Sequence, residues 1–179
     1  MSTHQPLAMV VVSLLAASEP PRTQAIRALA EKLGELCWIS EPIAFDFTDY
    51  YEQEMGAGLT RRIAAFTRLV EPWALAGIKR MSMDLEQRLA AGERRRVNID
   101  PGLLTAGAFV LATHKPRAHR PAIGEGLYAE CTLYYKGGAY QPLPWTYPDY
   151  ASEPLLGILG GLRERYLWLM RQTSHKQQG

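Results

Sequence analysis

Acidic and aromatic side chains alternate in the run FDFTDYYEQEMG, which covers residues 45–56. The spacing of Asp46 and Asp49 lets a turn aim both carboxylates at one point, and a third carboxylate from Asp100 or Glu130 completes a ligand set that suits magnesium. The alternative is that these acids only cap turns or face solvent. The run predicts the polar lip of a pocket, with Asp46, Asp49 and Asp100 as candidate magnesium ligands.

A basic segment, HKPRAHR at residues 114–120, is the second candidate. Arg120 can donate two hydrogen bonds to a phosphate or carboxylate, and His119 can exchange protons near neutral pH. Glu130 lies in the apolar run GLYAECTLYY, where an acid either pairs with an arginine or acts as a general base. The alternative for the basic segment is an exposed loop between two strands.

Two adjacent arginines and one aspartate add to these candidates. Strand alternation sends only one of Arg61 and Arg62 inward, where it needs a carboxylate partner such as Asp46 or Glu130. Asp100 precedes a Pro-Gly pair at the end of a short predicted strand, a place where catalytic and metal-binding groups are common. A local turn explains that aspartate equally well, because its side chain can accept hydrogen bonds from the amides that follow.

A second aromatic run, WTYPDY at residues 145–150, contains Pro148 and directly follows Pro144. Trp145 and Tyr147 can stack on a nucleobase or a sugar ring. The alternative is that these rings cover one end of the hydrophobic core.

Length and composition indicate one compact domain. The chain has 179 residues, 47% of them hydrophobic and 21% charged, with a formal net charge of +2, which favours no specific nucleic-acid partner. Cys37 and Cys131 are too few and too far apart for a disulfide framework, so we expect reduced thiols in the cytoplasm. No stretch approaches the roughly 18 apolar residues of a membrane span. We expect a single domain over residues 1–172 and a frayed tail over residues 173–179.

Hydrophobic periodicity predicts the elements that must position these side chains. Short apolar runs indicate strands, whereas apolar residues at three- and four-residue spacing indicate helices. The predicted helices cover residues 22–36, 71–89 and 155–170. The predicted strands cover residues 7–15, 37–47, 59–70, 97–99, 106–113, 123–135 and 139–143. Residues 59–70 also fit a helical period, and we favour a strand because it can pair with the one that ends at residue 47.

Turn signals indicate how these elements connect. Asp-Pro-Gly at residues 100–102 predicts a sharp turn, and Lys-Gly-Gly at 136–138 predicts a hairpin. Residues 48–58 are expected to form the long loop between two paired strands. The order of elements predicts an α+β fold with a mostly antiparallel sheet and the helices packed on one face. Its opening half is similar to a ferredoxin-like βαββαβ layout.

Four longer blocks of the sequence are distinctive: SEPIAFDFTDYYEQEMG, RRRVNIDPG, GLYAECTLYY and PLPWTYPDY. Together they resemble the bacterial family catalogued as domain of unknown function 4416. The resemblance runs from about the first predicted strand to about the last predicted helix. It implies a common fold over nearly the whole chain and no particular activity.

Some relatives in that family carry the description GTP-binding protein. A GTPase needs a glycine-rich loop that ends in Gly-Lys-Ser/Thr, and the segment after the first predicted strand here reads SLLAASEPP. Pro116 also follows Lys115 where a guanine-reading motif would supply an aspartate. The sequence therefore does not favour a GTPase.

We expect a cytoplasmic protein that binds a small anionic or nucleotide-like ligand with a divalent cation, for which magnesium is the candidate. The expected site lies at one end of the sheet and combines Asp46, Asp49, Arg62, Asp100, His119, Arg120, Glu130, Trp145 and Tyr147. The alternative is a non-catalytic module for protein interaction or self-association, whose surface is the aromatic and proline-rich loop. The sequence predicts neither a reaction nor an oligomeric state.

Overall fold

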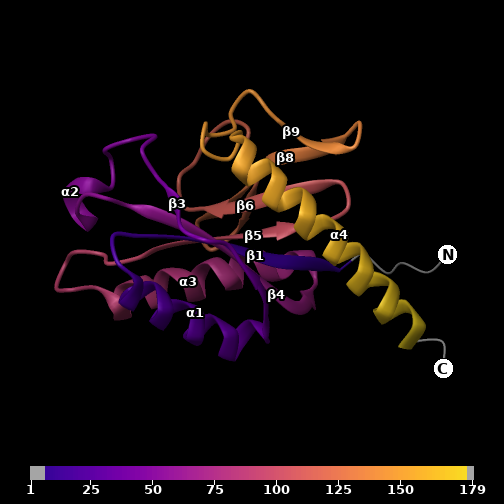
Figure 1. Ribbon diagram of the computed structural model, residues 1–179, viewed down its shortest axis with the longest axis horizontal. Coiled ribbons are helices and arrows are strands. Elements are labelled where there is room, and N and C mark those ends of the chain that lie inside the picture. The colour runs from indigo at the N-terminus through magenta and orange to yellow at the C-terminus, as the bar shows by residue number, and fades with distance from the viewer. Residues whose placement is uncertain (1–6, 177–179) are drawn as a thin grey trace.

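A computed structural model describes the backbone of residues 7–176 and the side chains of residues 7–173. Within this range the chain forms one nine-stranded sheet, in which neighbouring strands are antiparallel, and three long helices that lie against it (Figure 1). The predicted α+β class with an antiparallel sheet is confirmed.

The first half of the chain folds as βαββαβ. Its strands lie side by side in the order β2-β4-β1-β5, which is the order of a ferredoxin-like sheet, so the predicted layout of this half is confirmed. The main elements are β1 (Ala8–Ala16), α1 (Glu19–Leu33), β2 (Leu36–Ile39), β4 (Thr60–Val70), α3 (Leu75–Leu89) and β5 (Asn98–Leu104). Shorter ones are β3 (Ile43–Ala44), α2 (Glu52–Met55) and the 3-10 turn η1 (Pro72–Ala74).

The second half extends the same sheet beyond β5 in the order β6-β8-β7, and β9 pairs with β8. These strands are β6 (Ala108–Thr113), β7 (Ala122–Gly124), β8 (Leu127–Lys136) and β9 (Ala139–Pro142). Gly137 and Gly138 have φ angles of 63° and 87°, which glycine adopts without strain, and the predicted hairpin between β8 and β9 is confirmed.

The last element that the structure describes is a long helix, α4 (Glu153–Lys176), which continues through the first residues of the predicted tail. Residues 177–179 of that tail lie outside the described residues. Among the helices that the structure describes, none combines the length and the apolar character that a membrane crossing requires.

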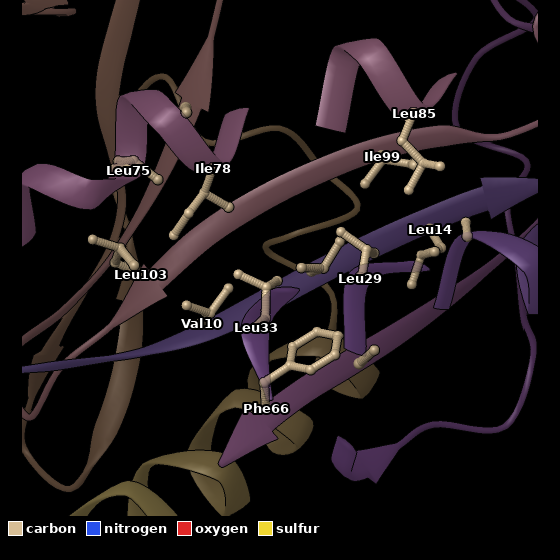
Figure 2. Packing of buried hydrophobic residues seen from close by; sticks show 14 of the residues in the cluster. Val10, Leu14, Leu29, Leu33, Phe66, Leu75, Ile78, Leu85, Ile99 and Leu103 are labelled. Carbon is tan, nitrogen blue, oxygen red and sulfur yellow. The ribbon is translucent and has the colours of Figure 1, made fainter. Parts of the chain in front are cut away.

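α1 and α3 cover one face of the β2-β4-β1-β5 half of the sheet (Figure 1). Figure 2 shows the packing: Val10 and Leu14 of β1 meet Leu29 of α1, with Phe66 and Ile99 from the neighbouring strands. Alternate residues of each strand point to the same face, so every second apolar residue of β1 contributes to this layer.

α4 lies across the opposite face, which corrects the prediction that all helices pack on one side (Figure 1). Met9 and Val11 of β1 pack there against Leu159 and Leu162 of α4. The reason is visible in β1, which is buried at every position and therefore needs cover on both faces.

β5 and β6 separate into a fork at one end of the sheet. They pair only from Gly102 opposite Leu111 to Leu104 opposite Phe109. The preceding residues of β5 therefore keep β1 as a partner but leave their other edge open. The candidate site lies beside this open edge.

The predicted Asp-Pro-Gly turn at residues 100–102 is wrong, because β5 runs straight through it. Pro101 pairs with Val12 of β1 and lies two residues after Ile99, so the nitrogens of Pro101 and Ile99 point to the same open edge. A proline, which has no N–H, is tolerated there because no neighbouring strand needs its hydrogen bond.

Candidate functional site

A cavity of about 530 Å³ lies at the fork between β5 and β6. Its floor includes Arg61 of β4 and Asp100 of β5, and its walls come from the segments around residues 45–51, 113–120 and 147–150. Strand alternation places Arg61 and Asp100 on the face that α4 covers elsewhere, so the cavity occupies the part of that face that α4 leaves free.

Arg61 is a deeply buried cation of the cavity, at 6% exposure. Its guanidinium carbon lies 5.0 Å from the ring centre of Phe45 and 4.9 Å from that of Tyr150, and Nη2 lies 2.6 Å from Oδ2 of Asp149. Nε and Nη1 of Arg61 are buried and have no hydrogen-bond partner within the described part of the chain. An arginine in this state has donors left for an anion.

Two side chains of α3 satisfy the open backbone edge of β5 at Ile99. Lys79 Nζ donates to the Ile99 carbonyl at 3.1 Å, and the Ile99 N–H donates to Oε1 of Glu86 at 2.5 Å. Lys79 also donates to Oδ1 of Asp100 at 2.9 Å, and Asn98 donates to Oδ2 of the same carboxylate at 2.7 Å. α3 therefore reaches into the cavity through the fork.

The two acids beside this edge have opposite pKa shifts. Burial raises the pKa of Glu86 to about 7, against the lowering effects of the Ile99 N–H and of the Lys79 charge. Burial also acts to raise the pKa of Asp100, but the charge and hydrogen bond of Lys79, with the hydrogen bond from Asn98, hold that pKa below its usual value. Near neutral pH, Asp100 is ionised and Glu86 exchanges its proton.

Arg95 closes the cavity on the side of α2. It binds Glu54 through two hydrogen bonds, Nε to Oε1 at 2.8 Å and Nη2 to Oε2 at 2.7 Å, and its Nη1 donates to Oδ1 of Asn98 at 2.8 Å. The hydrogen bonds to Glu54 raise the pKa of Arg95 and, in return, the bonds from Arg95 lower the pKa of Glu54. Its charge is therefore largely satisfied within the protein.

A second cluster joins the basic segment to β8. Arg120 Nε donates to Oε2 of Glu130 at 2.5 Å, and His119 Nε2 lies 2.9 Å from the same oxygen. The His119 ring stacks on Trp145, with centroids 4.6 Å apart, and the Trp145 indole N–H donates to the Cys131 carbonyl at 2.8 Å. This cluster ties the loop that contains Trp145 to the sheet.

The mouth of the cavity is aromatic and basic. Phe47, Tyr50 and Tyr147 line it and are 46%, 64% and 51% exposed, respectively. Lys115 Nζ lies 4.7 Å from the ring centre of Tyr50 and makes no salt bridge to any described residue. His114 also lines the cavity, and burial, with the nearby Lys79 and Lys115 charges, lowers its pKa.

The structure brings together only part of the residue set expected from the sequence. Four of the expected residues line the cavity, and two more lie directly behind it in the Glu130 cluster. The lining residues are Asp100, Arg120, Glu130 and Tyr147, and the two behind it are His119 and Trp145.

The other three expected residues lie elsewhere. Asp46 and Asp49 are exposed and do not line the cavity, although the aromatic residues between them do. Arg62 points to the opposite face, where it lies 3.6 Å from Glu19, so Arg61 and not Arg62 lines the cavity. Among the described side chains no group of three or more His, Cys, Asp or Glu residues is placed to hold a metal ion, and the three candidate magnesium ligands do not meet.

Sequence reasoning missed Lys79 and Glu86, although a signal for them exists. Both lie on the buried stripe of α3, together with Leu75, Ile78 and Leu85. A charged residue at a position where the helical period demands an apolar one needs a buried polar partner. Here that partner is the open edge of β5.

Comparison with known proteins assigns a family. No curated protein and no solved structure matches the chain. The family model described as "Domain of unknown function (DUF4416)" matches residues 6–166, which include every residue that lines the cavity. The chain therefore belongs to this family.

Proposed function

We propose that the protein binds a small organic anion that carries a planar ring, such as a nucleotide, in the cavity at the fork. The observation that carries the proposal is the buried guanidinium of Arg61, whose Nε and Nη1 have no partner within the described part of the chain. Leaving a buried donor unsatisfied costs about 1–3 kcal/mol, and a bound anion would recover that cost.

The balance of charges in the cavity supports an anion rather than a cation. Five lysine and arginine side chains, His114 and four carboxylates line it. Three of the carboxylates bind basic side chains of the same cavity closely, and the fourth, Glu86, lies 3.8 Å from Arg95. Lys115, in contrast, has only the ring of Tyr50 as a neighbouring partner among the described residues. Lys115 and Arg61 are therefore the groups that we assign to the anionic end of the ligand.

The exposed rings at the mouth support a planar group on the same ligand. Phe47, Tyr50 and Tyr147 present apolar faces to the cavity, and ring stacking of this kind contributes about 1–3 kcal/mol per base in nucleic-acid-binding proteins. Because the described carboxylates form no metal cluster, a divalent cation would arrive with the phosphates of the ligand.

The alternative proposal, an interaction module based on the loop at residues 142–150, has weaker support. Trp145 is held by His119 and by the Cys131 carbonyl, and Tyr150 is 4% exposed. Tyr150 therefore belongs to the interior, and Trp145 is held in place although it is 37% exposed, which leaves Tyr147 as the most exposed ring of that loop.

The test is calorimetric titration with AMP, inorganic phosphate and adenosine, each with and without magnesium. We expect AMP to bind more tightly than phosphate or adenosine, because only AMP has both the anion and the ring. Lys115→Ala should weaken AMP binding by about ten- to a hundredfold, the value of one charged hydrogen bond, while Arg117→Ala in the same loop is the control. Arg117 is exposed and outside the cavity.

A second matched pair tests Arg61. Arg61→Lys keeps the charge but removes the forked donors, and we expect it to weaken AMP binding, whereas Arg62→Lys on the opposite face should not. Failure of AMP and phosphate to bind, or equal effects of the paired variants, would overturn the proposal.

A further inference from the structure

Glu86 has one carboxylate oxygen in use and one free. Oε1 accepts the hydrogen bond of the Ile99 N–H, while Oε2 lies 3.8 Å from Nη1 of Arg95, which is longer than a hydrogen bond. The residue is 7% exposed and lines the cavity. One oxygen is enough to satisfy the edge of β5, so the second is available to a ligand.

The charged groups around Glu86 are already committed to other partners. Lys79 of α3 binds Asp100 of β5, and Arg95 binds Glu54 of α2 through two hydrogen bonds. Glu86 is thus a buried carboxylate whose nearest cation, Arg95 at 3.8 Å, is hydrogen-bonded to another acid. Burial and the charge of the nearby Asp100 both favour the neutral form of Glu86. The rise of its pKa to about 7, with burial as the main cause, agrees with this geometry.

We propose that Glu86 contacts the bound anion in its neutral form and donates a hydrogen bond to it from the carboxyl O–H, so that ligand binding takes up one proton from solvent. The inference rests on the proposed function and names a further binding residue of the same site. A neutral glutamic acid can accept the Ile99 N–H at one oxygen and donate from the other at the same time. An anion placed beside Glu86 disfavours its ionised form, so protonation and binding support each other.

The alternative is that Glu86 serves only as the acceptor for Ile99. In that case its protonation state does not matter to a ligand, and binding shows no dependence on it. Both cases need a side chain at this position, and only the proposal predicts that ligand binding depends on the protonation of Glu86. The informative variant is therefore Glu86→Gln, which keeps the side chain and removes its titration. Glutamine is neutral at every pH and retains both an acceptor for Ile99 and a donor for the anion.

The experiment compares the dissociation constant of AMP for the wild type and for Glu86→Gln across the neutral pH range. The phosphate of AMP titrates equally in both titrations, so the ratio of the two constants isolates Glu86. We express the ratio as the dissociation constant of the wild type divided by that of Glu86→Gln. We expect it to be near one at low pH and to rise by about tenfold per pH unit above the pKa of Glu86, because the wild type must then take up a proton in order to bind.

His114 needs its own control, because it is a second titratable side chain of the same cavity, and burial lowers its pKa. When both proteins also carry His114→Asn, the ratio between them should keep its dependence on pH. If that dependence disappears in the His114→Asn background, the proton belongs to His114 and the inference is overturned.

A measurement without ligand completes the design. Carbon-13 NMR of the glutamate carboxyl groups, with Glu86 assigned by the signal that Glu86→Gln removes, should show a midpoint near neutrality. A midpoint near 4.3, the ordinary value for glutamate, overturns the inference whether or not AMP binds. AMP binding with a ratio that is independent of pH overturns the inference alone. Absence of binding by AMP and phosphate overturns the proposed function and the inference with it.

Discussion

The two faces of the sheet differ in the side chains that they present. The face under α1 and α3 is apolar across β4, β1 and β5, with residues such as Phe66, Leu29 and Ile99 fully buried. The face under α4 is apolar only where that helix lies, and where it is free the same strands present Arg61 and Asp100. The residues of the proposed binding site and the larger apolar layer therefore lie on different parts of one sheet, and we expect substitutions in one part to leave the other largely intact.

The largest expected effect comes from the apolar face. Phe66→Ala removes a fully buried ring from the layer between β4 and α1, and should lower the free energy of unfolding by about 3–5 kcal/mol. Tyr50→Ala, at the mouth of the cavity, should change it by less than about 0.5 kcal/mol because the ring is exposed. Urea unfolding measures both changes. A similar loss of unfolding free energy in the two variants would contradict the separation of the apolar layer from the cavity.

An intermediate effect is expected where α3 joins the two regions. Lys79→Met leaves the Ile99 carbonyl and the Asp100 carboxylate without their cation, which should cost about 2–3 kcal/mol. The neighbouring Arg80→Met removes only an exposed pair with Glu125, for which about 0–1 kcal/mol is usual. Chemical denaturation of the two variants at neutral pH gives the comparison.

The same pair of variants has a distinct pH signature. The pKa of Asp100 is depressed in the folded protein, so its ionised form stabilises the fold at neutral pH, and that stabilisation is lost as the pH falls through the folded pKa. Lys79→Met should therefore approach the wild type in stability at acid pH. A deficit that is the same at every pH would show that Lys79 acts through packing alone.

The smallest effect is expected at the point where the fork begins. A Cβ on Gly102 would lie 2.7 Å from the ring of Phe109, which itself packs against Tyr150 of the cavity wall. Gly102→Ala should cost about 1–2 kcal/mol and weaken AMP binding, because the ring must shift. Gly107→Ala meets no atom within 4 Å, so it is the control, and equal thermal stability of the two variants would contradict this account.

The sequence by itself determined the elements of the fold. Period and turn chemistry located the three long helices, the opening βαββαβ order and the hairpin at residues 136–138, because burial patterns and glycine conformations are local properties. The family followed from long blocks of sequence as well. Among the residues that line the cavity, Glu130 was singled out because an acid in an apolar strand needs a partner, and Arg120 is that partner in the structure.

Only the tertiary structure decided which face each element covers and which side chains meet. α4 lies across the second face because β1 requires cover on both sides. The hydrophobic pattern of α4 itself does not indicate which face of the sheet the helix covers. Asp-Pro-Gly is a strand because β6 leaves its edge open, which depends on a pairing between distant segments. Lys79, Glu86 and Arg61 converge for the same reason: the fork that gathers them is a property of the assembled sheet and of none of its strands alone.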